Sequence, residues 1–291
     1  MGSINYVPTG SGRMGILWTI GTIGETAVLE FGSMGHMIYA SKWFERSNLR
    51  LKSQLVATHI NERDISLGIT KRINDAVKEV LDSGVKVVFL LPSSVPETIG
   101  IDMESIAMEL SAQYPEVTFI PFDKGGMRET LFEGIEEALY KICKHVSFDP
   151  PKAHESIMVN IIGSHIDFEN FHSDMREIKR LLKKAFNINI NCILTAETSW
   201  SKIKSMSNAQ LSIAIRKEGV KACKYLSKKH GTPYVAGRPY GYEGTIRWLE
   251  AIAKALDVDI DRSFIEKELD EGQHTLNTLK MMLSYGLGSS R

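Results

Sequence analysis

The stretch Thr26-Ala27-Val28-Leu29-Glu30-Phe31, which leads into Gly32-Ser33-Met34-Gly35-His36, decides the fold of this chain. Its first part is short and apolar and its second part begins with glycine, so together they predict a buried strand that ends in a loop. Similar stretches follow at residues 54–59, 85–91 and 117–121. We therefore expect four strands in the first half of the chain.

Amphipathic segments separate these strands. Apolar residues recur at helical spacing between Ile69 and Leu81, and again between Leu131 and Ile142, which predicts two helices that lie on the sheet. Strands that alternate with helices are typical of a parallel sheet with crossover connections. The fold class that we expect is therefore α/β.

The second half repeats this alternation. Strands are expected near residues 157–162, 188–194, 211–215 and 234–236, with helices near 173–186, 219–230 and 243–256 and a long last helix from Ile265 to Leu283, before a flexible tail. Because two adjacent prolines, Pro150 and Pro151, disfavour a helix, we place a boundary there. The prediction is two Rossmann-like units, each a mostly parallel sheet flanked by helices, at residues 1–150 and 151–291.

The composition excludes several classes of function. Lysine plus arginine (35) equals aspartate plus glutamate (35), so no overall charge attracts nucleic acid. No apolar stretch approaches the roughly 20 residues of a membrane helix, and no leader segment is recognisable at the N-terminus. We expect a cytoplasmic protein without nucleic-acid or membrane partners.

The three cysteines have the surroundings of core residues. Cys143 and Cys223 follow the apolar stripes of two predicted helices, and Cys192 alternates with the asparagines of a predicted strand. Three thiols in a chain of this length make no disulfide framework. We interpret all three as small buried side chains in a reducing compartment.

The segment Gly10-Ser11-Gly12-Arg13-Met14-Gly15 spells GxGxxG, and Glu30 follows near the end of the next strand. This is the dinucleotide fingerprint, in which glycines let a pyrophosphate approach the start of a helix. The buried strand that should precede it is missing, because Pro8 and Thr9 intervene. We favour a flexible leading loop here, and keep a nicotinamide-dependent enzyme that uses Gly10 to Gly15 as a weaker alternative.

Loops after three predicted strands indicate a ligand site. His36, Ser94 and the pair Gly125-Gly126 each follow a strand, and the carboxyl ends of parallel strands form the ligand crevice of such sheets. We take His36, Ser94, Gly125 and Gly126 as candidate rim residues. His36 is a possible metal ligand, although no second histidine or carboxylate at ligand spacing accompanies it. Catalytic residues cannot be assigned from the pattern.

Six stretches in order carry a resemblance to a known family. They are residues 27–36, Asn61-Glu62-Arg63-Asp64-Ile65-Ser66-Leu67-Gly68, residues 94–102, Pro121-Phe122-Asp123-Lys124-Gly125-Gly126, Val159-Asn160-Ile161-Ile162-Gly163 and Lys229-His230-Gly231-Thr232-Pro233-Tyr234. Together they resemble the nitrogenase component 1 family, which includes the nitrogenase molybdenum–iron protein subunits, their cofactor-assembly scaffold, and the dark-operative protochlorophyllide and chlorin reductases.

This resemblance implies an oxidoreductase subunit with an iron–sulfur cluster. It would form a homo- or hetero-oligomer with an identical or paralogous component 1-type subunit, and would receive electrons from an ATP-dependent iron protein, which is an iron–sulfur reductase. The family has three Rossmann-like domains, and this sequence ends about where the third would begin.

The sequence departs from the family where cluster cysteines are expected. Those positions hold Val7 or Pro8, His36 and Ser94, and Ile215 stands where the catalytic subunit of nitrogenase ligates its cofactor through cysteine. None of these supplies a thiolate, although histidine and serine do ligate iron in some proteins. The cofactor is therefore left unassigned, and a non-catalytic scaffold or ligand-binding module of the same fold is the alternative.

Overall fold

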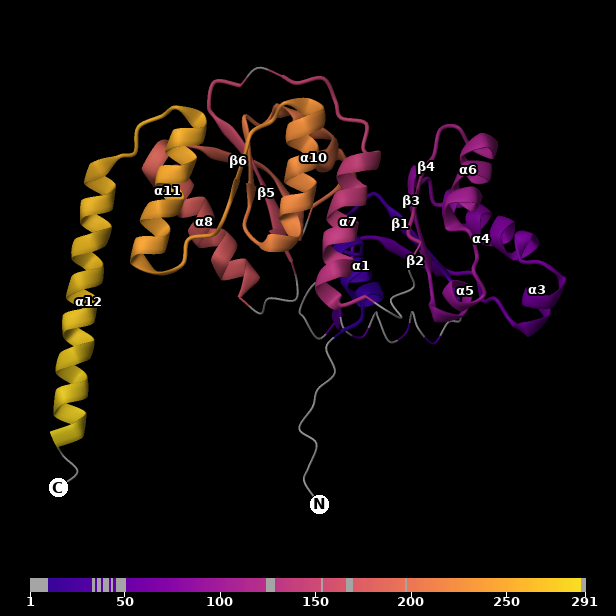
Figure 1. Cartoon of the computed structure of the whole chain (residues 1–291), viewed down its shortest axis with the longest axis horizontal. Coiled ribbons are helices and arrows are strands. Elements are labelled where there is room, and N and C mark those ends of the chain that lie inside the picture. Colours follow the sequence, from indigo (N-terminus) through magenta and orange to yellow (C-terminus); the bar gives the residue numbers. More distant parts are fainter. Residues whose placement is uncertain are drawn as a thin grey trace.

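A computed structural model describes residues 10–32, 35, 38, 42, 44–45, 51–123, 129–152, 154–165, 170–196 and 198–288. The candidate residues His36, Gly125 and Gly126 lie outside this part of the chain. Two four-stranded sheets stand side by side, each with helices against it, and a long last helix extends away from the second sheet (Figure 1). The predicted α/β class is confirmed.

The first sheet contains β1 (Ala27–Phe31), β2 (Gln54–Ala57), β3 (Val87–Pro92) and β4 (Thr118–Pro121). All neighbouring strands are parallel, in the order β2-β1-β3-β4. Every residue of β1 and β3 is buried, which explains why both read as continuous apolar runs and not as alternating ones. Each of the four predicted strands overlaps an observed one.

Helices cover both faces of this sheet. Leu29 and Leu90 point to the face that packs on α4 (Thr70–Asp82) and α6 (Met103–Gln113). Val28 and Phe89 point to the opposite face, because side chains alternate along a strand, and belong to the core that includes α1 (Gly12–Ile20) and α7 (Leu131–His145). The short helices α3 (Glu62–Leu67) and α5 (Ser94–Thr98) follow β2 and β3.

The second sheet contains β5 (Met158–Ser164), β6 (Asn189–Thr195), β7 (Leu211–Ala214) and β8 (Tyr234–Ala236), parallel and in the order β6-β5-β7-β8. Around it lie α8 (Phe171–Phe186), α9 (Trp200–Lys204), α10 (Val220–His230) and α11 (Gly241–Leu256), with short 3-10 turns η1 (Ser205–Asn208) and η2 (Lys217–Gly219). The two sheets therefore have the same strand arrangement.

One hydrophobic core joins the two sheets. Helix α7 contacts α1 on one side and α10 on the other (Figure 1), and Leu139 of α7 shares a buried cluster with Val28 of β1 and Cys223 of α10. The predicted boundary near residue 150 falls between α7 and β5. The division of the chain into domains at residues 1–150 and 151–291 stays a prediction.

The last helix, α12 (Arg262–Gly288), is the predicted long C-terminal helix. It continues through Gly288, so the expectation of a flexible tail from Gly286 was wrong for its first residues. No helix in the described part of the chain is both long and apolar enough to cross a membrane.

Candidate functional site

The rim predicted on the first sheet can be followed through the described strands. The chain passes from β1 to β2 on one side and then crosses to β3 on the other, and such a reversal of direction opens a crevice at the carboxyl ends of the strands. There the Gly32 amide donates to Thr58 Oγ1 at 3.1 Å and the Ser93 amide donates to the Phe31 carbonyl at 2.8 Å. Ser94 follows as the half-buried first residue of α5.

Two buried polar features lie at this rim. Arg13 of α1 pairs with Glu30 of β1, and their side chains are only 8% and 1% exposed. The Ser93 hydroxyl is also buried and has no hydrogen-bond partner among the described residues. The GxGxxG interpretation makes Glu30 the acid of a dinucleotide site, whereas the structure engages its carboxylate in an ion pair.

The glycines of the GxGxxG segment have a packing role. A Cβ atom on Gly12 or Gly15 would collide with the chain around residues 129–131, and one on Gly134 of α7 would collide with the Gly12 backbone. The Gly12 amide donates to the Glu129 carbonyl at 2.8 Å. Helix α1 therefore begins at Gly12 in close contact with α7, and the expected flexible loop does not extend beyond Ser11. The Gly12 amide at the start of the helix, where a pyrophosphate would bind, is therefore already engaged by Glu129.

The end of β4 is held by a buried lysine. Lys141 Nζ donates to the Pro121 carbonyl at 2.7 Å, to Glu104 at 2.8 Å and to Asp123 at 3.1 Å. Burial alone would lower the pKa of Lys141, but the hydrogen bond to Glu104 and the charge of Asp123 outweigh it and raise the pKa. The Asp123 carboxylate of the family-like 121–126 stretch is thus committed to Lys141.

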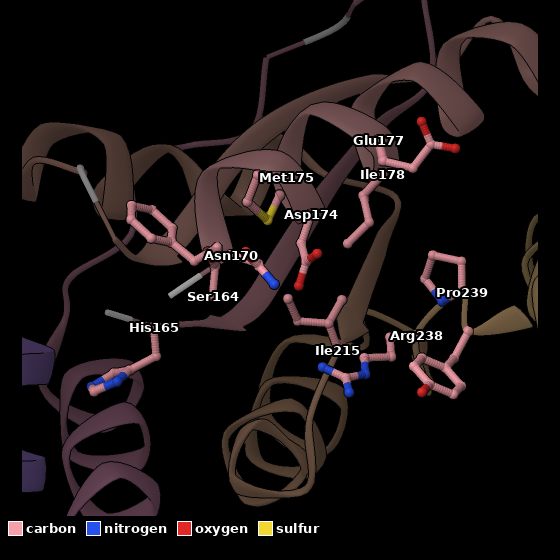
Figure 2. A pocket seen from close by; sticks show the side chains of 12 residues that line it. Ser164, His165, Asn170, Asp174, Met175, Glu177, Ile178, Ile215, Arg238 and Pro239 are labelled. Carbon is pink, nitrogen blue, oxygen red and sulfur yellow. The ribbon is translucent and has the colours of Figure 1, made fainter. Parts of the chain in front are cut away.

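A cavity of about 290 Å³ lies at the corresponding edge of the second sheet. It sits where β5 and β7, the strands at the change of direction, end beside each other. The first turns of α8 and the loop after β8 close it (Figure 2). The lining residues are Ser164, His165, Asn170, Phe171, Asp174, Met175, Glu177, Ile178, Ile215, Arg238, Pro239 and Tyr240.

Local backbone geometry places Ser164 and Ile215 in this cavity. Gly163 has a φ of +99°, and a Cβ atom there would lie 2.7 Å from Cγ of Arg216, so only glycine fits between β5 and the chain after β7. The Ile215 amide donates to the Ile162 carbonyl at 3.0 Å. Ser164 follows Gly163, and its hydroxyl is buried without a hydrogen-bond partner among the described residues.

The polar groups of the cavity stand on two sides of it. Asn170 and Asp174 belong to the start of α8, and the guanidinium of Arg238 lies 5.7 Å from the centre of the Tyr240 ring. Figure 2 shows Asp174 and Arg238 on opposite sides, with Ile215 between them in this view. The lining of the cavity therefore combines two carboxylates, those of Asp174 and Glu177, with the guanidinium of Arg238 and with apolar side chains.

His165 belongs to the lining of the cavity. Its imidazole turns away from Asp174 and Arg238 (Figure 2) and lies 2.9 Å from Thr19 Oγ1 of α1. Both side chains are buried. This contact ties the cavity wall to the first unit.

The three cysteines are buried and free, as predicted. Burial raises the pKa of Cys192 to about 11 and that of Cys223 to about 12, and it raises the pKa of Cys143 as well. A thiolate is the form that binds metals, so these thiols do not suit an iron–sulfur cluster. Among the described residues, no group of three or more histidines, cysteines and acids could hold a metal ion.

Sequence reasoning found Ile215 through the family resemblance but missed Ser164, Asp174 and Arg238. Ser164 and Arg238 lie at or just after the ends of strands, so the rule that pointed to Ser94 in the first half would have pointed to them in the second. Asp174 gives no such signal, because its place depends on how α8 packs. Of the four predicted rim residues, only Ser94 lies within the described part of the chain.

Comparison with known proteins gives a consistent result. The model of the family described as nitrogenase component 1 type oxidoreductase matches residues 11–285. The B subunit of the light-independent protochlorophyllide reductase from Heliobacterium modesticaldum is 25% identical over 69% of this chain and 38% of its own length. The nitrogenase iron-molybdenum cofactor biosynthesis protein NifE from Bradyrhizobium diazoefficiens is 21% identical over 80% of this chain and 44% of its own.

The fold is shared with solved nitrogenase structures. Nitrogenase Cp1 at pH 5 superposes with a TM-score of 0.73 and 18% sequence identity, over 97% of this chain and 59% of that one. The chain thus spans less than two thirds of the length of each of these three proteins. Because the family model covers nearly all of the sequence, the chain belongs to the nitrogenase component 1 type oxidoreductase family.

Proposed function

We propose that this chain is one subunit of a nitrogenase-like oxidoreductase, to which it contributes a ligand cavity but no cluster thiolates. The cavity at the ends of β5, β7 and β8 carries the proposal. Its volume of about 290 Å³ lies near the lower end of the range for small-molecule sites. The buried Ser164 hydroxyl, which has no partner among the described residues, supports a role in binding.

The names of the relatives support pairing with a second protein of the same kind. They include the B subunit of a reductase and the beta chains of iron-iron and vanadium-iron nitrogenases. The partner in our proposal is an identical or paralogous component 1-type subunit, and an ATP-dependent iron protein supplies the electrons. The reduced, buried thiols suit the cytoplasm.

Any iron–sulfur cluster in this assembly would take its thiolates from the partner. The three cysteines of this chain are core residues, so the chain itself has no thiolate set to offer. We propose that the rim of the first sheet, with His36, Ser94, Gly125 and Gly126, faces the shared group. His36 and Ser94 are the residues of this rim that could add a ligand to iron.

The burial of all three cysteines also favours a second candidate, a scaffold or binding module of the same fold without redox chemistry. Such a module would capture a ligand in stoichiometric amount and release it unchanged. An oxidoreductase subunit would instead convert it when partner, reductase and ATP are present. Single-turnover assays on the anaerobic complex separate the two.

A cavity-filling variant tests the role of the cavity. In Ile215→Trp an indole replaces a half-buried side chain of the lining. We expect the variant to co-purify with the same partner, but to show a decrease of at least about tenfold in bound ligand and in turnover rate. Met108→Trp is the matched control, because Met108 is 73% exposed on α6. If Ile215→Trp turned over like Met108→Trp, the cavity would have no part in the function.

A further inference from the structure

A second hollow lies between the two units, next to the candidate cavity. It is a groove of about 830 Å³ bordered by Gly24 and Lys52 of the first unit and by α8, β6 and the start of α9 of the second. Gly24 and Ser199 form a β-bridge at its edge. The groove and the candidate cavity share Ser164, Phe171 and Met175, so a ligand in one would lie beside the other.

The walls of this groove are strongly cationic. Lys52, Arg176, Lys179 and Lys202 all line it, and each is exposed. None of the four side chains forms an ion pair or hydrogen bond within the described part of the chain, whereas Lys141 and Arg180 are each bound by two acids. The four cations come from three separate segments of the chain: α8, the start of α9 and the residues before β2.

The one acid among the described lining residues of the groove forms no ion pair with these cations. Both carboxylate oxygens of Glu25 accept hydrogen bonds from Ser201, from its amide at 2.8 Å and from its hydroxyl at 3.0 Å. In a chain with no net charge, four cations against one acid is a local excess. Converging cations raise the local concentration of anions and favour their binding.

The lining of the groove adds one buried hydroxyl suited to a bound anion. The Ser164 hydroxyl is buried and has no partner in the described part of the chain, so it can donate a hydrogen bond. Asn191 is also buried in the lining, and its amide nitrogen already donates to Asn160 Oδ1 at 3.0 Å and to the Ser205 carbonyl at 2.9 Å. Of these two buried side chains, Ser164 therefore offers the free donor.

We infer that this groove binds a small polyanion, a molecule that carries two or more phosphate or carboxylate groups. Because the cations come from α8, from α9 and from the chain before β2, a ligand with more than one anionic group could engage several of them. The volume of the groove matches sites for small molecules, and its concave form distinguishes it from a flat surface for an acidic protein. This inference does not depend on the proposed oxidoreductase function.

Calorimetric titration of the full chain with tripolyphosphate and with citrate tests the inference. We expect at least one of them to bind with a Kd of about 1 mM or tighter, and more weakly as salt rises, because exposed cations are screened. Binding of tripolyphosphate alone would identify a phosphate ligand, and binding of citrate alone a carboxylate ligand. If neither bound, the inference would be wrong.

Paired variants locate the binding. Lys179→Gln with Lys202→Gln removes two groove cations, and we expect the Kd to rise at least about tenfold. Lys228→Gln with Lys254→Gln removes the same charge from exposed positions on α10 and α11, and should change the Kd less than about twofold. Equal losses in both pairs, or capture of acidic proteins without either small anion, would overturn the inference.

Discussion

Thr19 of α1 and His165 at the end of β5 form a buried contact of 2.9 Å between the two units. The Thr19 hydroxyl also donates to the Gly15 carbonyl at 2.7 Å. Because a hydroxyl has a single hydrogen, its oxygen must accept from Nε2–H of His165. The wall of the candidate cavity is thereby fixed to the helix that precedes β1.

Thr19→Val should destabilise the protein, because it leaves the buried Nε2–H of His165 without this acceptor. The expected loss in the free energy of unfolding is about 1–3 kcal/mol by urea denaturation. Thr98→Val is the control, since the Thr98 hydroxyl bonds the Ser94 carbonyl at 2.7 Å at an exposed position and should matter by less than about 0.5 kcal/mol. Equal effects would show that the Thr19 contact carries no weight.

The contact between α1 and α7 should not tolerate a methyl group. In Gly134→Ala the new Cβ meets the Gly12 backbone, so we expect a loss of about 1–3 kcal/mol from overpacking. Gly244→Ala in α11 meets no described atom within 4 Å and should stabilise by up to about 1 kcal/mol through helix propensity. Urea unfolding of both variants measures the difference.

The same contact predicts no response to nicotinamide cofactors. A ligand at 100 times its Kd adds about 2.7 kcal/mol of stability, so binding would raise the thermal midpoint visibly. We expect no shift with NAD or NADP. If NAD or NADP raised the thermal midpoint of the wild type but not that of Gly15→Ala, the GxGxxG segment would be a dinucleotide-binding site.

The buried thiols predict a stability that falls at alkaline pH. The pKa of Cys223 is raised from its ordinary value of 9.0 to about 12 in the folded protein, so the thiol ionises first in the unfolded chain. The contribution of the Cys223 thiol to the free energy of unfolding is fully present below about pH 9 and is lost as the pH rises toward about 12. Between about pH 8.5 and about pH 10, the wild type should lose about 1 kcal/mol more than Cys223→Ala. Parallel pH curves would contradict the burial of this thiol.

Ser164→Ala should separate binding from stability. The Ser164 hydroxyl has no partner among the described residues of the folded protein, so its removal should leave the free energy of unfolding unchanged or raise it by about 1 kcal/mol. The complex that contains this variant should nevertheless purify without the ligand of the candidate cavity. Destabilisation by more than about 1 kcal/mol would mean that the hydroxyl is satisfied within the protein.

The strands were predictable because the pattern of apolar residues in each strand reflects its burial in the sheet. β1 and β3 are buried on both faces and read as apolar runs, and glycine, proline or serine follows each. Helix α5 was not predicted, since its five residues are too few to show a period. The paired arrangement of α1 and α7 was also hidden, because the GxGxxG pattern has the same glycines whether a phosphate or a helix approaches them.

The candidate site was predictable only in part. Ser94 follows β3 as the first residue of α5, and Ile215 lines the cavity, but the sequence could not show that Arg13 binds Glu30 or that Asp174 and Arg238 line one cavity. Each of these relations joins residues of different elements whose distance is set by packing. Periodicity and spacing describe single elements, and carry no information on such pairs.

Strictly anaerobic purification of the tagged chain from its native host tests the central claim most directly. Iron, acid-labile sulfide and the identity of any co-purified protein should be measured on the same sample. We predict a complex with a component 1-type subunit that contains iron and sulfide, and that keeps both when Cys143, Cys192 and Cys223 are each replaced by alanine. A chain that purified without such a partner, and without iron, would contradict the account.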